Sequence, residues 1–197
     1  MVIGMDSCEG HLAVALREKA NVSYRVVDCN LPIPFIDTGT VDLVNIATAL
    51  HWLDQDKFYR EVDRLLRPGG CFSVIAVNHH DMQIEDDVVR AIRDKIYSML
   101  PNMEGVAEQE TFSEFKDLRL PYTKSVKYPI AYNTAEHTAE SALNSLLTIH
   151  NFTAFNRSHQ GFRQEFLKMF TEWQDGDANK KFTVRTPLLQ AISQKPA

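Results

Sequence analysis

Four short polar stretches stand directly after apolar segments of the chain, and their side chains could bind or position a ligand. They are Asp6-Ser7-Cys8, Asp28-Cys29-Asn30, the residues from Ala47 to Trp52, and Asn78-His79-His80. In an open sheet of parallel strands, ligands bind beyond the carboxyl ends of the strands. If the apolar segments are such strands, the four stretches lie at one edge of the sheet and form a candidate binding site.

Asp6 and Asp28 are the acidic residues of these stretches, and each has two interpretations. A carboxylate at the end of a strand can accept two hydrogen bonds from the vicinal hydroxyls of a ribose, a role that suits Asp6. Asp6 could equally interact with the positive end of a following helix, an effect worth only about 0.3–1 kcal/mol. Asp28 could accept a hydrogen bond from an adenine amino group, or it could be a polar residue of a loop.

Strands and helices that would position these residues are predicted to alternate up to residue 77. The predicted strands are 2–5, 22–27, 41–46 and 71–77, and the predicted helices are about 8–20 and 55–66. Ser7 can cap the first of these helices. This alternation is typical of a parallel, doubly wound α/β sheet with right-handed crossovers. The strand at 71–77 is the most apolar and is predicted to be central.

The predicted helix at 55–66 has one apolar face. Its apolar side chains are Phe58, Val62 and Leu65, and the side chains predicted to face water are Lys57, Arg60, Glu61 and Arg64. This spacing is typical of an amphipathic helix that packs on a sheet. The sequence RPGG at 67–70 is predicted to end the helix, because proline cannot extend it and the glycines allow a sharp reversal.

The chain after residue 78 follows a different pattern. Helices are predicted at about 84–100, 111–118, 135–149 and 159–173, and strands at 125–132 and 181–192. Pro187 interrupts the last strand, which indicates a bulge or an edge position. The pattern predicts one Rossmann-like domain with a helical insertion between 79 and 124 and a second helical piece after 125–132.

Composition excludes several classes of partner. The chain has 197 residues and a formal net charge of -5, with no basic tract, which argues against nucleic acid as a partner. No apolar run approaches the roughly 20 residues needed to span a bilayer, and no signal peptide is visible. The three cysteines are odd in number and widely spaced, as expected of reduced thiols. We therefore expect a cytoplasmic protein that binds neither nucleic acid nor a membrane.

Two long segments resemble the class I S-adenosylmethionine-dependent methyltransferases. They are VIGMDSCEGHLAVALREK and RVVDCNLPIPFIDTGTVDLVNIATALHWLDQDKFYREVDRLLRPGGCFSVIAV, and together they span 2–77. The chain is more narrowly similar to the small-molecule branch labelled methyltransferase type 11, which includes trans-aconitate methyltransferase-like proteins. NFTAFNR at 151–157 and VRTPLLQAI at 184–192 stand where members of that branch carry comparable segments.

The resemblance implies a Rossmann-like fold, S-adenosylmethionine as cofactor and a small-molecule acceptor. It assigns cofactor contacts to Asp6, Ser7, Cys8, Asp28, Cys29, Asn45 and Ala47. Asp6 would hold the ribose hydroxyls, and Asp28 would meet the adenine amino group. The single domain would comprise a cofactor-binding half at 1–78, helical cap insertions around one strand at 79–160, and a C-terminal helix and strand at 161–197. The insertion would form a lid over the acceptor pocket.

His51 and Trp52 are the implied catalytic residues, facing the methyl group or the substrate. His51 could act as a general base or bind an acceptor carboxylate, and it could equally be structural. Trp52 could attract a sulfonium through its π face, or it could be a core aromatic residue. His79 and His80 follow the central strand, but adjacent side chains on a strand diverge, so we predict no metal site. Arg157 and Arg185 could hold an anionic substrate or pair with surface carboxylates.

One feature of the family is missing from the sequence. Members begin with a strand and a glycine-rich loop, whereas none of the eight glycines of this chain falls in a GxGxG pattern. The missing strand would lie in the sheet between the strands at 2–5 and 41–46, and would leave two unpaired edges there. We expect a truncated chain, a rearranged sheet, or a gap filled by another chain, for example in a dimer through the open edge.

The leading hypothesis is methyl transfer from S-adenosylmethionine to a small molecule, impaired by the N-terminal truncation. The alternative is a catalytically inactive methyltransferase-like fragment that acts as a binding or regulatory module. A nucleotide-linked oxidoreductase is the third hypothesis, because Asp6 would also suit the ribose of a dinucleotide. The RPGG before an apolar strand and the ALHW after VDLV favour the methyltransferase.

Overall fold

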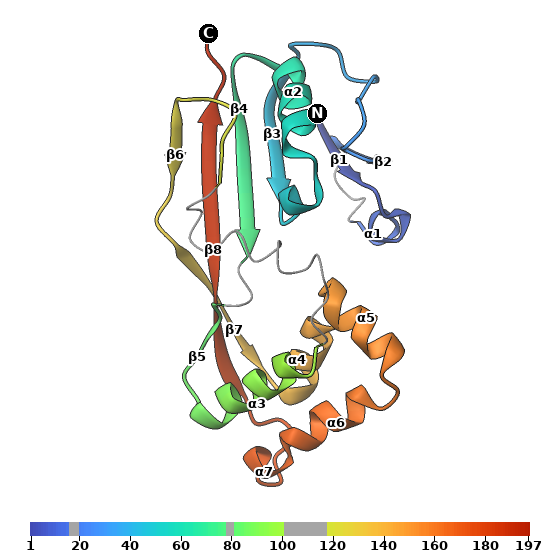
Figure 1. Ribbon diagram of the computed structural model, residues 1–197, viewed down its shortest axis with the longest axis vertical. Helices are drawn as coiled ribbons and strands as arrows, with labels where there is room; N and C mark the ends of the chain where they lie inside the picture. The colour runs from blue at the N-terminus through green and yellow to red at the C-terminus, as the bar shows by residue number, and fades with distance from the viewer. Residues whose placement is uncertain (16–19, 78–80, 101–117) are drawn as a thin grey trace. The chain divides into compact units, whose positions relative to one another are not determined.

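The computed structural model describes residues 1–15, 20–77, 81–100 and 118–197 (Figure 1). The chain divides into two compact units. Unit 1 comprises Met1–Ala76, Arg119–Tyr128 and Gln190–Ala197, and unit 2 comprises Val77–Leu118 and Pro129–Leu189. The predicted division into a cofactor-binding half, cap insertions and a C-terminal part stays a prediction.

Unit 1 contains the predicted alternation of strands and helices. Its elements are β1 (Val2–Asp6), α1 (Glu9–Ala13), β2 (Val22–Val26), β3 (Val41–Ala47), the 3-10 helix η1 (Leu50–Trp52), α2 (Gln55–Leu65), β4 (Leu66–Val77), β6 (Ser125–Lys127) and the end of β8 (Phe182–Gln194). The pairs β1–β2 and β3–β4 are parallel, as expected of a doubly wound sheet. The predicted α/β fold class is therefore confirmed.

The strands of the described residues form two separate sheets. One is the two-stranded sheet β1–β2, and the other has the order β3-β4-β8-β5, where β5 is Gln83–Ile84, with β6 and β7 (Ala131–His137) also paired to β8. Among the described residues, β1 pairs only with β2, and β3 pairs only with β4. The sheet is thus interrupted between β1 and β3, where the sequence predicted a gap. Association of a second chain at these edges stays a prediction.

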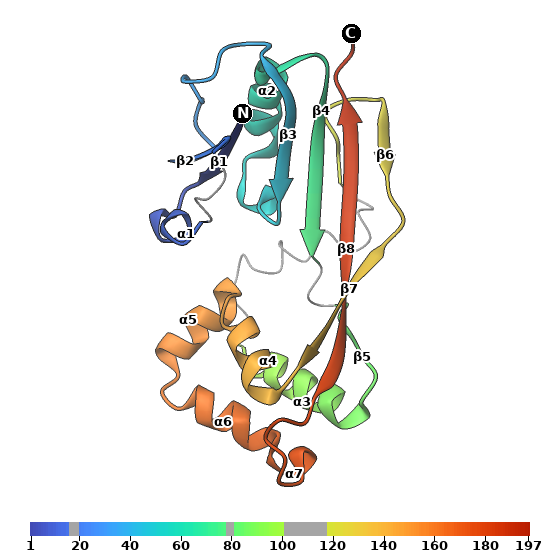
Figure 2. The same ribbon diagram turned by 180° about the vertical axis from the view of Figure 1, so that it is seen from behind.

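Helix α2 packs on β4 through the predicted apolar face (Figures 1 and 2). Phe58, Val62 and Leu65 are buried, and the Phe58 ring meets the Phe72 ring edge-on at a centroid distance of 6.0 Å. Asp54 caps the helix by accepting a hydrogen bond from the Lys57 amide. The period of the sequence therefore predicted both the helix and its buried face.

The RPGG sequence lies inside β4 rather than between the helix and the strand. The helix ends at Leu65 and β4 begins at Leu66. The register with β3 shifts between Val41, which is opposite Leu66, and Leu43, which is opposite Cys71. The extra residues on β4 form an irregularity in which Gly69 has a φ of 75°. Glycine is suited to this conformation because it has no Cβ atom.

The first helix is shorter than predicted and has a different cap. Helix α1 ends at Ala13, and its N-cap is Cys8, which makes no side-chain capping bond. The prediction that Ser7 caps this helix is therefore wrong. The Asp6 carboxylate accepts a hydrogen bond from the Cys8 amide instead. Residues 16–19 of the predicted helix lie outside the described residues.

Unit 2 combines an antiparallel strand pair with short helices. Its elements are β5 (Gln83–Ile84), α3 (Asp87–Ser98), β7, α4 (Ala139–Leu146), α5 (His150–Ser158), α6 (Phe162–Met169), α7 (Thr171–Gln174) and most of β8. Six aromatic residues dominate its core: Phe152, Phe162, Phe166, Phe170, Trp173 and Phe182. They belong to α5, α6, α7 and β8, except Phe170, which stands between α6 and α7. Their packing therefore joins these helices to β8.

Several predicted boundaries in the second half are wrong. The strand predicted at 125–132 is divided into β6 and β7, and the helix predicted at 135–149 begins only at Ala139 because β7 runs to His137. Helix α5 was not predicted, and the helix predicted at 159–173 is divided into α6 and α7. Pro187 lies opposite Tyr132 in a register with β7 that continues without a shift. The helix predicted at 111–118 lies outside the described residues except for its last position.

No helix in the described part of the chain is long and apolar enough to cross a membrane.

Candidate cofactor site

The carboxyl ends of β1 and β2 lie side by side. The strands are parallel, with Asp6 opposite Val26, and the Val27 amide donates a hydrogen bond to the Asp6 carbonyl at 3.0 Å. Burial raises the pKa of the Cys29 thiol, and the negative charges of Asp28 and Asp6 raise it further. Asp28 follows Val27 directly, so Asp6 and Asp28 stand at the same edge of this sheet, with Cys29 next in the chain.

The Asp6 carboxylate is partly exposed and accepts hydrogen bonds from within unit 1. Its Oδ1 atom accepts from the Cys8 amide at 2.8 Å, and its Oδ2 atom lies 3.2 Å from Nδ1 of His11. Partial burial raises the pKa of Asp6, but the bond from Cys8 and the contact with His11 outweigh it and lower the pKa below its usual value. An ionised carboxylate has about four acceptor positions, so Asp6 keeps capacity for the hydroxyls of a ligand.

The turn after β2 presents Asp28 to solvent. The Asp28 Oδ1 atom accepts from the Asn30 amide at 2.9 Å, and the Leu31 amide donates to the Asp28 carbonyl at 3.0 Å. Aspartate side chains commonly stabilise turns by bonding to the backbone two residues on. Ser7 and Cys8, which are also predicted to contact the cofactor, are exposed and therefore accessible to a ligand.

Asn45 and Ala47 are exposed on β3. They are two residues apart on a strand, so their side chains point to the same face. The strand ends in a turn at Thr48, which has a φ of 51° and donates its amide to the Ile75 carbonyl at 2.8 Å. No hydrogen bond among the described residues joins Asn45 or Ala47 to Asp6, and their predicted role stays a prediction.

His51 and Trp52 form an aromatic pair in η1, directly after this turn. Their ring centroids are 5.2 Å apart, and the ring planes are inclined by 46°. Trp52 is 51% exposed, which argues against a core role, whereas Leu50 beside it is buried and anchors the turn. Burial lowers the pKa of His51 below its ordinary value of 6.5. At neutral pH the imidazole is therefore mainly uncharged and can accept a proton.

A hydrogen bond connects the turn that carries Asp28 to the segment that follows His51 and Trp52. The Asn30 Oδ1 atom accepts from the Asp54 amide at 2.8 Å. Asn30 belongs to the turn that presents Asp28, and Asp54 follows the His51-Trp52 turn and caps α2. The structure therefore joins the loop after β2 to the segment that carries the predicted catalytic residues.

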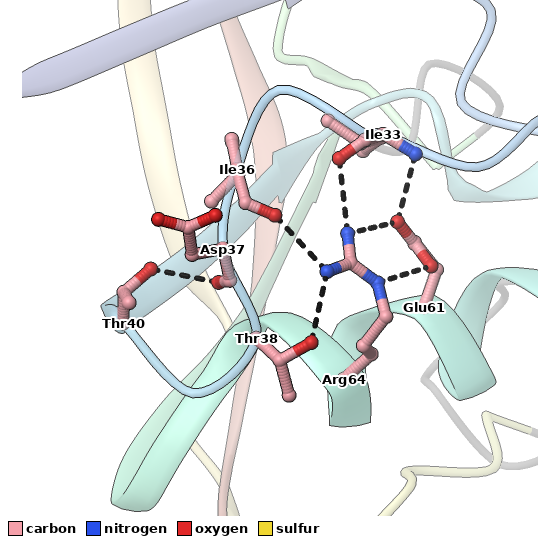
Figure 3. Close-up of polar contacts among 7 residues, drawn as sticks. All are labelled: Ile33, Ile36, Asp37, Thr38, Thr40, Glu61 and Arg64. Carbon is pink, nitrogen blue, oxygen red and sulfur yellow. Dashed lines mark hydrogen bonds and ion pairs between the residues drawn. The ribbon is translucent and has the colours of Figure 1, made fainter.

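Glu61 and Arg64 were predicted to face water, and this prediction is wrong. Their side chains are only 14% and 32% exposed, and they bind each other and the loop after β2 (Figure 3). A helical period assigns residues to faces of a helix, but it does not show that a proline-containing loop covers the polar face. Two features of the sequence could have indicated the contact. They are the acidic and basic residues three positions apart on the helix, and the two prolines of NLPIPF at 30–35, which have no amide hydrogens to donate.

The other candidates belong to unit 2 or fall outside the described residues. His79 and His80 fall outside the described residues, and no group of three or more metal-ligating side chains occurs within the described ranges. The Arg185 guanidinium lies over the Tyr132 ring, 4.7 Å from its centroid. Arg157 is exposed on α5.

Two open hollows lie along the surface of α2. Their volumes are about 340 and 500 Å³, and both are lined by Asp56, Tyr59 and Arg119. None of the predicted site residues lines either hollow. The chemistry of the strand ends, rather than these hollows, therefore defines the candidate site.

Comparisons with known proteins agree with the fold. Residues 1–74 match a family model described as a methyltransferase domain. A Dictyostelium discoideum protein named as a methyltransferase is 26% identical over 211 residues, which cover 98% of this chain and 74% of that protein. A solved structure from Anaeromyxobacter dehalogenans, described as a type II methyltransferase, has a TM-score of 0.70 and 23% identity, covering 99% of this chain and 81% of that chain.

A further solved structure is the Haemonchus contortus phosphoethanolamine N-methyltransferase 2 in complex with S-adenosylhomocysteine. It has a TM-score of 0.41 and 19% identity, covering 99% of this chain and 43% of that chain. The first 74 residues thus match a methyltransferase domain, and the chain shares the fold of the Anaeromyxobacter dehalogenans structure, in agreement with the resemblance seen in the sequence.

Proposed function

We propose that the chain binds S-adenosylmethionine at the carboxyl edge of β1 and β2 and transfers its methyl group to a small-molecule acceptor. The observation that carries the proposal is the pair of carboxylates at neighbouring strand ends. Asp6 is opposite Val26 in the parallel register and its carbonyl accepts from the Val27 amide, so Asp28, the next residue, belongs to the same edge. Carboxylates at such positions suit the hydroxyls of a ribose and the amino group of an adenine.

The residues present fit the nucleoside end of this cofactor. Asp6 is ionised at neutral pH, partly exposed and keeps acceptor capacity, while Asp28 is exposed on a fixed turn. The methionine end has fewer candidates, because no glycine of the chain lies in a GxGxG pattern. Asn45 and Ala47 on β3 are the residues that we propose for it.

The cofactor, when bound, supplies a methyl group that is already activated on a sulfonium. The chain then has to align an acceptor and exclude water rather than supply a strong catalyst. The uncharged imidazole of His51 is suited to accept a proton from an acceptor hydroxyl or amine. The exposed Trp52 ring beside it offers a π face to a cation.

Calorimetric titration with S-adenosylhomocysteine tests the proposal. We expect Asp6→Ala to weaken binding by about 1.5–3 kcal/mol, or about 10- to 150-fold, as is typical for hydrogen bonds to a charged group. Asp42→Ala is the matched control, because Asp42 is an exposed carboxylate at the amino end of β3, paired with Arg67. Equal affinities of Asp6→Ala and the wild type would show that Asp6 is not the ribose ligand.

The alternative is a methyltransferase-like binding or regulatory module without activity. The absence of a GxGxG pattern in the sequence favours it. Titration of the folded wild type separates the two functions. Absence of heat at millimolar S-adenosylhomocysteine, with a folded far-ultraviolet circular dichroism spectrum, would favour the module.

A further inference from the structure

The segment 28–38, which we call the 28–38 loop, contains no helix or strand. It begins with Asp28, which is proposed to meet the adenine amino group, and Cys29, which is also predicted to contact the cofactor. It also contains Pro32 and Pro34, which have no amide hydrogen to donate. The loop therefore needs partners from elsewhere in the chain to hold one conformation.

Arg64 on α2 supplies most of these partners. Its Nη2 atom donates to the Ile33 carbonyl at 2.9 Å, and its Nη1 atom donates to the Ile36 carbonyl at 3.0 Å and to Thr38 Oγ1 at 3.2 Å (Figure 3). A guanidinium is planar and rigid, so its donors hold the three acceptor oxygens of the loop at fixed positions relative to one another. The loop is thereby held along the side of α2.

Glu61 completes the arrangement from one turn earlier on α2. Its Oε1 atom accepts from the Ile33 amide at 2.8 Å and from Arg64 Nη2 at 2.7 Å, and its Oε2 atom accepts from Arg64 Nε at 3.0 Å. The bidentate pair orients the guanidinium toward the loop. Both the amide and the carbonyl of Ile33 are bound, and its side chain is only 1% exposed.

Two more contacts fix the loop, one before Ile33 and one between Ile33 and Ile36. Asn30 Oδ1 accepts from the Asp54 amide at the start of α2. The Arg25 guanidinium of β2 lies over the Phe35 ring, 4.6 Å from its centroid. The loop is therefore attached to β2 and to both ends of α2. Displacing its middle would also displace the turn that presents Asp28.

We propose that Glu61 and Arg64 are positioning residues for the nucleoside end of the cofactor site. They hold the 28–38 loop in the conformation that presents Asp28 and Cys29, and they do not touch the cofactor. This inference rests on the proposed function, since it assumes that the nucleoside binds at the edge of β1 and β2. A purely structural pair would stabilise unit 1 without changing the affinity of the folded protein.

The test compares Arg64→Lys with Arg67→Lys. Both variants keep the positive charge, and Arg67 lies a few residues away, where it binds Asp42 and the Pro68 carbonyl rather than the loop. Lysine cannot reproduce the fork of donors that reaches the loop and Glu61. Titrations with S-adenosylhomocysteine and with adenosine are made well below the melting temperature of each variant, so that unfolding does not contribute.

We expect Arg64→Lys to weaken the binding of both ligands by the same factor. The factor is about ten if a tenth of the variant molecules keep the loop conformation that presents Asp28. Arg67→Lys should bind both as the wild type does. Glu61→Gln is the second variant, and should weaken both ligands in the same direction. Amide exchange at Ile33 should be faster in Arg64→Lys and Glu61→Gln but not in Arg67→Lys.

The outcomes separate the two proposals. If the wild type binds and Arg64→Lys and Glu61→Gln bind equally well, the positioning role is wrong and the proposed function stands. If the variants bind S-adenosylhomocysteine more weakly but bind adenosine as the wild type does, the pair acts on another part of the site. The inference is then also overturned. If the folded wild type binds neither ligand, the proposed function fails and the inference fails with it.

Discussion

At the scale of single residues, burial makes the imidazole of His51 harder to protonate than that of an exposed histidine. It is half-buried beside Trp52, and burial lowers its pKa below the ordinary value of 6.5. The unfolded chain therefore binds a proton at a pH where the folded chain does not. By linkage, the free energy of unfolding falls as the pH falls below this value, because protonation favours the unfolded state.

We predict that His51→Gln removes part of this pH dependence. Urea unfolding at about pH 7.5 and about pH 5.5 should show a smaller loss of stability in the variant than in the wild type, since glutamine does not titrate. An equal loss in His51→Gln and the wild type would show that His51 is not kept uncharged by burial.

Single residues also show what the sequence could predict. The position of Asp6 at the end of a strand could be predicted because an apolar stretch followed by an acidic residue is a local pattern, while its role in binding stays a prediction. Glu61 and Arg64 were missed because their partners, Ile33, Ile36 and Thr38, are 25 or more positions earlier in the chain. A helical period identifies the face that packs on the sheet. It carries no information on a loop that returns over the opposite face.

At the scale of elements, the junction of α2 and β4 depends on the absence of a side chain at one glycine. A Cβ atom at Gly70 would lie 2.9 Å from the Arg67 carbonyl oxygen and 3.1 Å from the Val41 carbonyl oxygen. Both neighbours are backbone atoms, and Val41 belongs to β3. A side chain here would therefore push β3 and β4 apart at the irregular part of their register.

We predict that Gly70→Ala lowers the free energy of unfolding by about 1–3 kcal/mol, the usual cost of overpacking a close contact. Gly10→Ala is the control, because its Cβ would meet only the Cys8 Sγ atom at 3.6 Å. Alanine there should be neutral or stabilise by up to about 1 kcal/mol, since Gly10 lies in a helix. Equal urea midpoints for the two variants would contradict the close approach of β3 and β4.

Elements with strong local patterns were predicted better than elements fixed by pairing. The apolar strands at β1 and β4 and the amphipathic helix α2 follow from local periodicity. The segment at 131–137 was divided wrongly between a strand and a helix, because its polar residues AYNTAEH have no strand pattern of their own. It is a strand because it pairs with β8 over seven positions. Such long-range pairing is not visible in a local window of the sequence.

At the scale of the whole molecule, the two units have cores of different composition. The core of unit 1 is formed mainly by aliphatic residues of α2 and its strands, with Phe58 and Phe72. The core of unit 2 is built on contacting aromatic rings, with Phe166 between Phe162 at 6.2 Å and Phe170 at 5.3 Å. A large cavity at Phe166 should therefore act first on the stability of unit 2.

We predict that Phe166→Ala destabilises the protein by about 3–5 kcal/mol, the usual cost of truncating a buried phenylalanine. Phe166 is only 1% exposed and its neighbours are aromatic rings, so the cavity would offer water no hydrogen-bond partners and would stay empty. Amide exchange should be faster in α3, α4 and α6, while the amides of β3 and β4 keep their protection if the units open separately. Val88→Ala is the control, because this residue of α3 is 54% exposed. Equal acceleration in β3 and β4 would show that the units open as one.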